Sequence, residues 1–275
     1  MLNTALNLLK SKLKRTIVFV LALYLMIGSA LYFFQEKLLF LPTTLPQDYS
    51  YKFAHKFEEY FLSTKDGARI NALYFEAENP KGTIFYLHGN AGDLQRWGNI
   101  VSYLVNWNYN VYIMDYRTYG KSFGELSEAN MYDDTQMCYE HLKMLTNSEE
   151  IIVFGRSLGT GLATHISAKN NPKKLVLETP YLNIADVAKH RFPIFPVKRL
   201  LKYQFPSDKY IAEVSCSVAI FHGTSDLVVP YESGKKLYDL TNKANSILIT
   251  IDEGEHNNLI EFTEYQENLK SFLEQ

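Results

Sequence analysis

The sequence has little of what would mark a metalloprotein, a disulfide-rich protein or a nucleic-acid-binding protein. Only two cysteines occur in 275 residues. Cys138 falls in a helical pattern and Cys216 at a strand start, so each is interpreted as a small packing residue. No metal-ligand spacing is present. The formal net charge is −2, which leaves no excess of basic residues, and nucleic acid is therefore not an expected partner.

The chain also lacks internal repeats, low-complexity tracts and blocks of like charge, which argues against a solenoid and a disordered tail. A phosphate-binding loop is excluded at Gly120-Lys121-Ser122, because Asp115 stands where such a loop needs its upstream glycine. With 47% hydrophobic residues, a chain of this length can bury one large core. We therefore expect one folded domain.

A turn sequence at residues 155–159 is the most informative feature present. The apolar run 151–154 leads into Gly155-Arg156-Ser157-Leu158-Gly159 and then into a small-residue helix start. This is the pattern of a nucleophile elbow, in which a sharp strand-to-helix turn strains the central residue and flanking glycines avoid collisions. It predicts Ser157 as a nucleophile at the carboxyl edge of a sheet and at a helix N-terminus.

Two further loops follow in the order that such a nucleophile needs. The strand-like run 218–221 ends in His222-Gly223-Thr224-Ser225-Asp226, and the run 246–251 is followed by Asp252-Glu253-Gly254-Glu255-His256. Both loops are expected at the same edge of the sheet as the elbow. We therefore predict a triad of Ser157, Asp226 and His256. His222 and His88, each before a glycine, are interpreted as loop braces.

A fourth loop, His88-Gly89-Asn90-Ala91-Gly92, follows the run 83–87 where an oxyanion loop is expected. We assign the oxyanion hole to the backbone N–H groups of Leu158 and Asn90, with Ala91 as the fallback donor. The side chain of Asn90 is incidental in this interpretation. No cofactor and no metal is required, because the same histidine that activates the serine can activate the hydrolytic water.

Together these loops resemble those of the α/β-hydrolases, in particular the membrane-anchored, abhydrolase-domain-containing branch, whose members carry an N-terminal anchor and a short cap. The resemblance extends over about residues 57–275. It is carried by the 88–92 loop, Asp115-Tyr116-Arg117-Thr118-Tyr119-Gly120-Lys121-Ser122, the elbow, the 222–226 loop with Pro230, and Gly254-Glu255-His256. It implies serine hydrolysis of esters or thioesters.

Four residues near these loops bear on how closely the chain follows the family pattern. Thr118 stands where relatives usually have glycine, so the shape of its loop is an open point. Glu178 ends a strand where some relatives place their acid, and it competes with Asp226 for that role. Asp115 and Arg117 are expected to form a structural ion pair.

The N-terminus carries an uncharged run from Thr16 to Phe34, which at about 20 residues can span a bilayer. Basic residues precede it and only Lys37, beside an acid, follows closely, so the N-terminus is expected in the cytoplasm and the catalytic domain on the outer, periplasmic or extracytoplasmic side. Leu2, Leu6, Leu9 and Leu13 predict an interfacial helix before the span. The alternative is a signal peptide cleaved at Gly28-Ser29-Ala30.

Strand-like runs alternate with helical ones after this anchor, which predicts an α/β fold with a mostly parallel eight-stranded sheet flanked by helices. The first two strands are expected to form a hairpin through Lys65-Asp66-Gly67. The clearest helices are 128–145 and 257–273. The expected strands are 57–62, 69–75, 83–87, 111–115, 151–154, 175–178, 218–221 and 247–251.

The expected organisation is an amphipathic segment and transmembrane anchor at 1–35, a linker at 36–56 and an α/β-hydrolase domain at 57–275. Residues 181–214, about the length of a short cap, interrupt the alternation with apolar, proline and basic residues. They either form a cap over Ser157 that meets an acyl chain and lipid headgroups, or a helical connection packed on the sheet.

These patterns predict a membrane-anchored serine hydrolase that cleaves carboxylic ester or thioester bonds through an acyl-enzyme. The expected partners are a small-molecule or acyl-chain substrate and membrane lipid. A serine peptidase or aminopeptidase with the same triad is an alternative. A catalytically silent, membrane-tethered binding protein on this scaffold is an alternative of a different class. Lipid esters, acylated proteins and small xenobiotic esters all fit the pattern as substrates.

Overall fold

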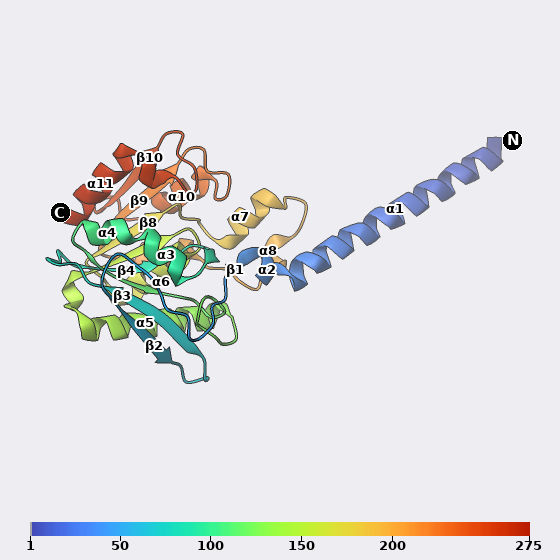
Figure 1. Ribbon diagram of the computed structural model, residues 1–275. Helices are drawn as coiled ribbons and strands as arrows, with labels where there is room; N and C mark the ends of the chain where they lie inside the picture. Colours follow the sequence, from blue (N-terminus) through green and yellow to red (C-terminus); the bar gives the residue numbers. More distant parts are fainter. Residues whose placement is uncertain (1) are drawn as a thin grey trace.

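The computed structural model describes residues 2–275, without Met1 and without the side chains of Leu2, Asn3 and Ala5. The side chain of Leu2, the first leucine of the predicted stripe, therefore lies outside the described part. The first element, α1 (Leu2–Phe33), projects from the α/β domain as one uninterrupted rod (Figure 1). Its segment Leu6–Phe33 is long and apolar enough to cross a membrane, with a mean hydropathy of 2.2. The predicted interfacial helix and the predicted span are thus one continuous helix.

The domain is built on an eight-stranded sheet with the strand order β10-β9-β8-β7-β4-β6-β3-β2. The hairpin strands β2 and β3 and the pair β3 and β6 are antiparallel, and all other neighbours are parallel. The predicted α/β-hydrolase fold is confirmed, and each predicted strand is present with small shifts at its ends. The strands are β2 (Phe57–Ser63), β3 (Arg69–Phe75), β4 (Thr83–Leu87), β6 (Asn110–Met114), β7 (Ile151–Arg156), β8 (Lys174–Glu178), β9 (Ser217–Gly223) and β10 (Ser246–Ile251).

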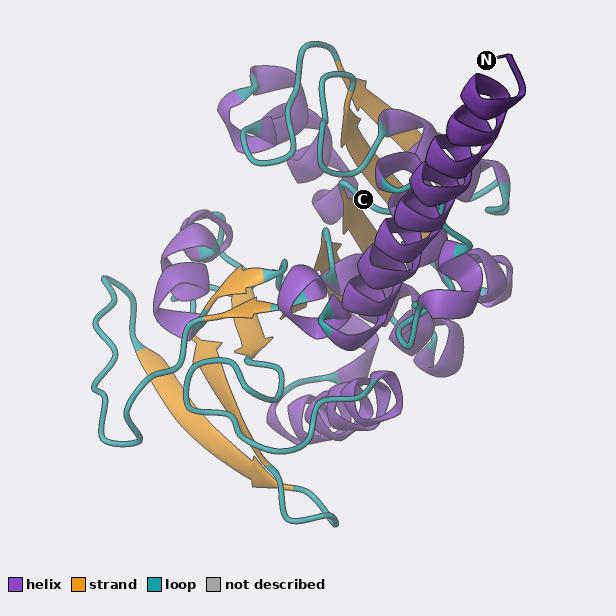
Figure 2. Ribbon diagram, turned by 90° about the vertical axis from the view of Figure 1, so that its right-hand side faces the viewer, coloured by secondary structure: helices purple, strands orange, loops and turns teal. Residues whose placement is uncertain are grey.

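Helices cover both faces of this sheet (Figure 2). One face packs against α5 (Glu128–Leu145), α6 (Gly159–Asn170) and α10 (Tyr231–Asp239). The other packs against α3 (Leu94–Ile100), α4 (Ser102–Asn106) and α11 (Thr263–Glu274). The central strands are buried on both sides, which is why they read as continuous apolar runs rather than alternating ones. Because β4, β7, β9 and β10 are parallel, the loops that follow them meet at one edge of the sheet.

The helix predicted over 128–145 is observed with these bounds, and the side chain of Ser127 caps it by accepting from Asn130 N–H. The helix predicted over 257–273 was wrong at its start, because α11 begins at Thr263. Before it, the Asn258 side chain accepts from Glu255 N–H at 2.7 Å. Such a side-chain bond to a nearby backbone competes with helix formation and stabilises a turn.

The stretch 36–56, expected as a linker, folds onto the domain. It contains most of α2 (Gln35–Leu39) and the short strand β1 (Leu41–Pro42), which pairs in parallel with β5 (Ala91–Gly92). Phe40 and Tyr51 from this stretch are buried. The chain between the long helix and the sheet therefore has a fixed path over the edge where the loops meet.

The region 181–214 has two halves. The first lies beside the cleft over Ser157, as a cap would, and the second packs on the sheet as a helical connection. Its first half, α7 (Ile184–Arg191) and α8 (Val197–Leu200), lies beside α2 and the base of α1 (Figure 1). Its second half contains α9 (Ser207–Tyr210), and Phe205 and Ile211 there are buried in the core. We use the name cap for residues 184–201, and the remainder is a connection packed on the sheet.

Candidate active site

The turn between β7 and α6 holds Ser157 in a left-handed backbone conformation, with φ of 50°. A non-glycine residue in this conformation is strained, and the surrounding structure must hold it there. Both flanking glycines are required by space. A Cβ on Gly159 would stand 2.0 Å from the carbonyl oxygen of Leu87, and one on Gly155 would stand 2.5 Å from the Cβ of Ala163. The elbow predicted from the sequence therefore has its expected geometry.

The structure brings Ser157, His256 and Asp226 into one chain of hydrogen bonds. The Ser157 Oγ lies 2.8 Å from His256 Nε2, and His256 Nδ1 lies 2.7 Å from Asp226 Oδ2. Because an ionised carboxylate can only accept, the proton belongs on Nδ1 and Nε2 is free to accept from the serine hydroxyl. The arrangement can move a proton from Ser157 to His256.

Asp226 is buried and is surrounded by hydrogen-bond donors. Its Oδ1 accepts from the N–H groups of Val228 at 2.8 Å and Val229 at 2.9 Å. The Nε2 of His222 lies 3.4 Å from Oδ2. Burial alone would raise the pKa of Asp226, but hydrogen bonds from His222 and His256 outweigh it and hold the pKa well below its usual range. This carboxylate is therefore charged at neutral pH.

Glu178, the competing acid, has other partners. Its Oε1 lies 3.0 Å from Arg156 Nε, and its Oε2 accepts from the hydroxyl of Tyr265 at 2.5 Å. Arg156 also donates to the side chain of Asn257 at 3.2 Å. Glu178 thus ties the elbow strand to α11 through Tyr265, while His256 pairs with Asp226.

The oxyanion loop lies against the chain that follows the anchor. Asn90 and Leu158 both line the cleft that contains Ser157, and neither of their N–H groups donates a hydrogen bond within residues 2–275. The interpretation of the Asn90 side chain as incidental was wrong, because its Oδ1 accepts from Leu41 N–H at 3.0 Å. Ala91, the fallback donor, lies in β5 and pairs with β1. Backbone groups of residues 41 and 42 therefore hold this loop in place.

The loop after β6 corrects a second interpretation. Asp115 and Arg117 do not pair with each other, since Arg117 bonds Asp134 at 2.7 Å and Asp66 at 2.5 Å. Asp115 is fully buried, lies 3.4 Å from His88 Nε2 and accepts from a backbone N–H. Thr118, directly after Arg117, has φ of 74°. Glycine adopts this conformation without strain, which explains the glycine expected at this position.

An apolar cleft of about 460 Å³ lies over Ser157. We call its polar side, formed by Ser157, Leu158, Asn90 and the loop after Asp226, the floor. The opposite side, formed by α2 and α7, is the roof. Within the described residues, the charged side chains that line the cleft are Lys37 and Arg191, both cations. The lining residues are Lys37, Leu38, Leu39, Leu41, Asn90, Ser157, Leu158, Tyr181, Ile184, Val187, Ala188, Arg191, Phe192, Val228 and Val229.

Sequence reasoning missed the contribution of α2 and β1 to this cleft. The signal available was the apolar run Leu38-Leu39-Phe40-Leu41 in a stretch expected to be a linker. His222 braces the loop after Asp226, as the sequence predicted, because its Nε2 lies 2.9 Å from the carbonyl oxygen of Val229. The position of the same nitrogen 3.4 Å from Asp226 Oδ2 was not predicted. No group of three or more His, Cys, Asp and Glu side chains within residues 2–275 is arranged to hold a metal ion.

Comparisons with known proteins agree with this geometry. A family model described as serine aminopeptidase, S33, matches residues 78–210. The lysophosphatidylserine lipase ABHD12 of Danio rerio is 30% identical over 292 residues, which cover 86% of this chain and 74% of that protein. The chain belongs to the abhydrolase-domain family of α/β-hydrolases. Another abhydrolase-domain relative, the uncharacterized protein YfhR of Escherichia coli (strain K12), is 31% identical over 206 residues, covering 71% of this chain and 72% of that protein.

Solved structures of α/β-hydrolases share the fold of this abhydrolase-domain protein. The esterase Pf2001 of Pyrococcus furiosus superposes with a TM-score of 0.65 at 20% identity, over 84% of this chain and 97% of that one. The mouse α/β-hydrolase domain-containing protein 10 gives a TM-score of 0.57 at 17% identity, over 78% of this chain and 96% of that one. The abhydrolase-domain protein is a serine hydrolase of the lipase and esterase type, and its apolar N-terminal helix fits a membrane protein.

Proposed function

We propose that this protein cleaves carboxylic ester or thioester bonds of acyl substrates, with Ser157 as nucleophile, His256 as general base and acid, and Asp226 as the group that orients the histidine. The observation that carries the proposal is the hydrogen-bonded chain from Ser157 Oγ through His256 to Asp226 in the floor of an apolar cleft. A serine in a strained turn, a histidine and a buried carboxylate in this order form an activated nucleophile.

In the proposed reaction, Ser157 Oγ attacks the acyl carbonyl while His256 Nε2 takes its proton. The C–O or C–S bond of the substrate then breaks, and the same nitrogen returns the proton to the leaving alcohol or thiol. A water molecule, deprotonated by His256, then attacks the acyl carbonyl. The bond from the acyl carbon to Ser157 Oγ breaks, His256 returns the proton to Oγ, and the acid is released. Asp226 stays ionised and stabilises the charge on the imidazolium.

The negative charge on the carbonyl oxygen needs donors at the point where it develops. We propose the backbone N–H groups of Leu158 and Asn90, with Ala91 as the fallback. Leu158 supports this role because it precedes α6 directly, where helix N–H groups favour negative charge. Asn90 supports it because its position is held by the bond between its side chain and Leu41.

We propose a lipid as the acyl substrate, with a negative charge near its ester. The cleft has an apolar lining, which suits an acyl chain. Lys37 and Arg191 line it and have no ion-pair partner among the described residues, so they are available to an anionic headgroup. The name of the zebrafish relative, lysophosphatidylserine lipase, supports a monoacyl anionic glycerophospholipid as the class.

A peptidase reading has one observation in its favour, the description of the matching family model as a serine aminopeptidase. An aminopeptidase must bind a substrate ammonium group, for which a carboxylate is the natural partner. The lining residues of the cleft include two cations and no acid. We therefore expect short acyl esters to be hydrolysed faster than peptide anilides, and the opposite order would favour the peptidase.

We further propose that residues 1–35 anchor the protein by a single span, with the N-terminus in the cytoplasm and the 57–275 hydrolase domain on the outer side. The support is the length and apolarity of Leu6–Phe33 and the lysines before the span. Digestion by protease added outside intact cells tests the orientation. Loss of the hydrolase domain is expected, and its protection would reverse the topology.

A fluorophosphonate probe tests the serine chemistry, because it labels only activated serines. The full-length wild-type protein should be labelled, and Ser157→Ala and His256→Ala should not be. Ser148→Ala is the matched control, since Ser148 is exposed in a short turn of helix before β7. Labelling of Ser157→Ala at the wild-type rate would overturn the assignment. No labelling of the folded wild type would favour the silent binding protein.

A further inference from the structure

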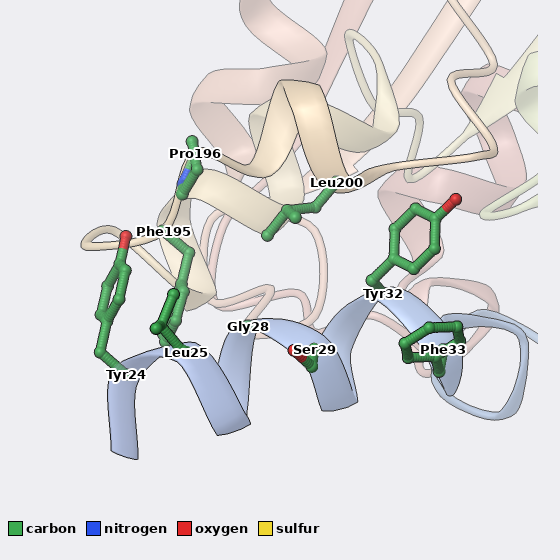
Figure 3. Close-up of a pocket in the computed structure, with 9 residues that line it drawn as sticks. All are labelled: Tyr24, Leu25, Gly28, Ser29, Tyr32, Phe33, Phe195, Pro196 and Leu200. Atoms are coloured by element: carbon green, nitrogen blue, oxygen red, sulfur yellow. The ribbon is translucent and has the colours of Figure 1, made fainter. Parts of the chain in front are cut away.

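One face of α1 is covered by the cap. Tyr24, Gly28, Leu31 and Gln35 are partly or fully buried, while the other described side chains from residue 4 to residue 34 are exposed. The spacing of three or four residues puts them on one side of the helix. The Tyr24 ring stacks on Phe195 with centroids 4.7 Å apart (Figure 3). Its hydroxyl donates to the carbonyl of Ile194 at 3.1 Å.

This contact lies well inside the apolar run. Lys10, Lys12, Lys14 and Arg15 cannot remain in a hydrocarbon core, so a span of about 20 residues has to begin near Thr16 and end near Phe33. Tyr24 is nine residues before Phe33 in the sequence, which is about 14 Å along the helix axis at about 1.5 Å per residue. Half of the hydrocarbon core is about 15 Å thick. A cap segment that touches Tyr24 therefore reaches toward the middle of the bilayer.

Residues 192–197 make this contact, and we call them the cap tip. Their sequence is Phe-Pro-Ile-Phe-Pro-Val, and Ile194 is 72% exposed. Basic residues stand on both sides, Arg191 before the tip and Lys198 and Arg199 after it, and no acid occurs from 189 to 202. An apolar loop between cations matches the change from hydrocarbon to anionic headgroups at a membrane surface.

Of the backbone N–H groups in the tip, that of Ile194 has no acceptor among the described residues, and the others have one. Two residues of the tip are prolines, which have no N–H. The N–H groups of Phe192, Phe195 and Val197 donate to Ala188, Phe192 and Phe195, at 2.8, 3.2 and 2.8 Å. The carbonyl of Ile194 accepts from Tyr24. In a bilayer, backbone groups must find such partners within the protein.

Three cavities connect this tip with the site. The first, about 290 Å³, lies between α1 and the cap and is lined by Tyr24, Gly28, Phe195 and Leu200 among others (Figure 3). The second, about 70 Å³, shares Leu200 with it. The second also shares Leu38, Leu39, Ala188 and Phe192 with the cleft over Ser157. The three cavities therefore lie in a row that marks out an apolar path from the side of α1 to the cleft over Ser157, and Leu200 stands between the first two.

We propose that the cap tip is inserted in the leaflet on the domain's side, and that a single acyl chain of a bilayer lipid passes from that leaflet along this path to Ser157. The proposal rests on the proposed esterase function for its second half only. The insertion of the tip rests on the proposed membrane span of α1, on the contact with Tyr24 and on the chemistry of residues 192–197. The substrate thus reaches the site sideways through the membrane rather than from water.

The depth of the tip is tested with the full-length protein in phosphatidylcholine vesicles. Ile194→Cys carries an environment-sensitive fluorophore, and the label is selective because Cys138 and Cys216 are buried. Nitroxides on lipid tails should quench it more strongly than nitroxides on headgroups. Ile247→Cys is the matched control, an isoleucine 48% exposed on β10, and neither quencher should act on it. Quenching at position 194 by neither lipid, as for a tip that faces water or a partner protein, would overturn the insertion.

The path is tested by a ratio of rates in the same vesicles, palmitoyl lysophosphatidylserine in the bilayer against nitrophenyl butyrate in water. Ile194→Asp should lower this ratio about tenfold or more, because a carboxylate is costly in hydrocarbon. Leu200→Trp should lower it by filling the shared wall of the first two cavities. Ile194→Leu and Ile247→Asp should keep the wild-type ratio. An unchanged ratio in both Ile194→Asp and Leu200→Trp would overturn the path.

The two proposals fail in different ways. If the wild type hydrolyses neither substrate and is not labelled by fluorophosphonate, the esterase function is wrong, while quenching at position 194 still decides the insertion. If the wild type hydrolyses both substrates and the ratio does not respond to the tip, the function stands and the sideways path is wrong.

Discussion

The floor of the cleft contains the hydrogen-bonded groups of the site, whereas its roof is lined mainly by apolar side chains and is partly exposed. Behind the floor, Asp226 by itself has four partners, which are the N–H groups of Val228 and Val229 and the rings of His222 and His256. In the roof, Leu38 and Arg191 are exposed, and α2 and α7 meet the cleft mainly through apolar side chains. Hydrogen bonds fix atoms in direction as well as distance, and apolar contacts do not. The floor is suited to chemistry and the roof to the choice of substrate.

The largest effect is expected from breaking the floor. Ser157→Ala removes the nucleophile, and Asp226→Asn replaces one acceptor oxygen by an NH2 donor, so the side chain no longer holds the proton of His256 on Nδ1. Each should lower kcat/KM for a short ester by about 10⁴-fold or more. Steady-state kinetics with protein whose folding is verified by thermal unfolding measures this. If kcat/KM of the Asp226→Asn enzyme were within tenfold of the wild-type value, another residue would have to orient His256.

Glu178→Gln compares the two candidate acids, because it changes Glu178, the alternative to Asp226, and leaves Asp226 intact. Removing one partner of the buried pair with Arg156 leaves a buried charge without its counter-ion, and the free energy of unfolding should fall by about 3 kcal/mol or more. Denaturant unfolding measures the loss. The folded variant should still hydrolyse short esters, which Asp226→Asn should not. Equal loss of activity in the two variants would contradict the separate roles.

The free energy of unfolding should depend on pH in a way that reflects the hydrogen bonds to the Asp226 carboxylate. Its pKa in the folded protein is held below the usual range by His222 and His256. A lowered pKa stabilises the fold at pH values above about 3.9, the usual value, and this stabilisation is lost as the pH falls toward the folded pKa. The stability gap between wild type and Asp226→Asn should therefore narrow below about pH 4. Parallel curves from pH 7 to pH 3 would be inconsistent with this.

The roof should respond in substrate preference rather than in chemistry. In Lys37→Gln with Arg191→Gln, the preference for an anionic over a neutral monoacyl ester should fall about tenfold, because two unpaired cations at the cleft are removed. Competition between the two lipids in mixed vesicles measures the preference. Lys143→Gln with Lys173→Gln, far from the cleft, should have no effect. An unchanged preference in the double roof variant would show that these cations do not contact the headgroup.

The smallest effect is expected at Thr118. Its φ of 74° is unfavourable for a β-branched residue, and glycine adopts it freely. Thr118→Gly should raise the free energy of unfolding by about 1 kcal/mol, reduced by the greater freedom of glycine in the unfolded chain. Thermal unfolding at neutral pH gives the sign. Destabilisation would show that contacts of the threonine side chain outweigh the strain.

The sequence predicted the floor better than the roof, for a physical reason. The elbow needs glycines at 155 and 159 because backbone atoms crowd those positions, so the chemistry leaves a local pattern. The strands are buried on both faces and are visible as apolar runs. The roof brings together α2 and α7, which are far apart in the sequence, and no local spacing encodes that arrangement. The predicted start of α11 was wrong for a related reason. The Asn258 side chain accepts a hydrogen bond from Glu255 N–H, and this stabilises a turn where the sequence has a helical pattern.

The hydrogen bonds of Gln35 limit how the N-terminal helix of such a chain can be replaced in evolution. This buried glutamine donates to the carbonyl of Leu200 at 3.0 Å and accepts from the N–H of Lys202 at 2.7 Å. The helix that precedes it is therefore joined to the substrate wall through both ends of one amide. Such a helix is not an exchangeable module: a lipid modification or an unrelated helix could keep the protein at the membrane and still leave the cavity between α1 and the cap without one side.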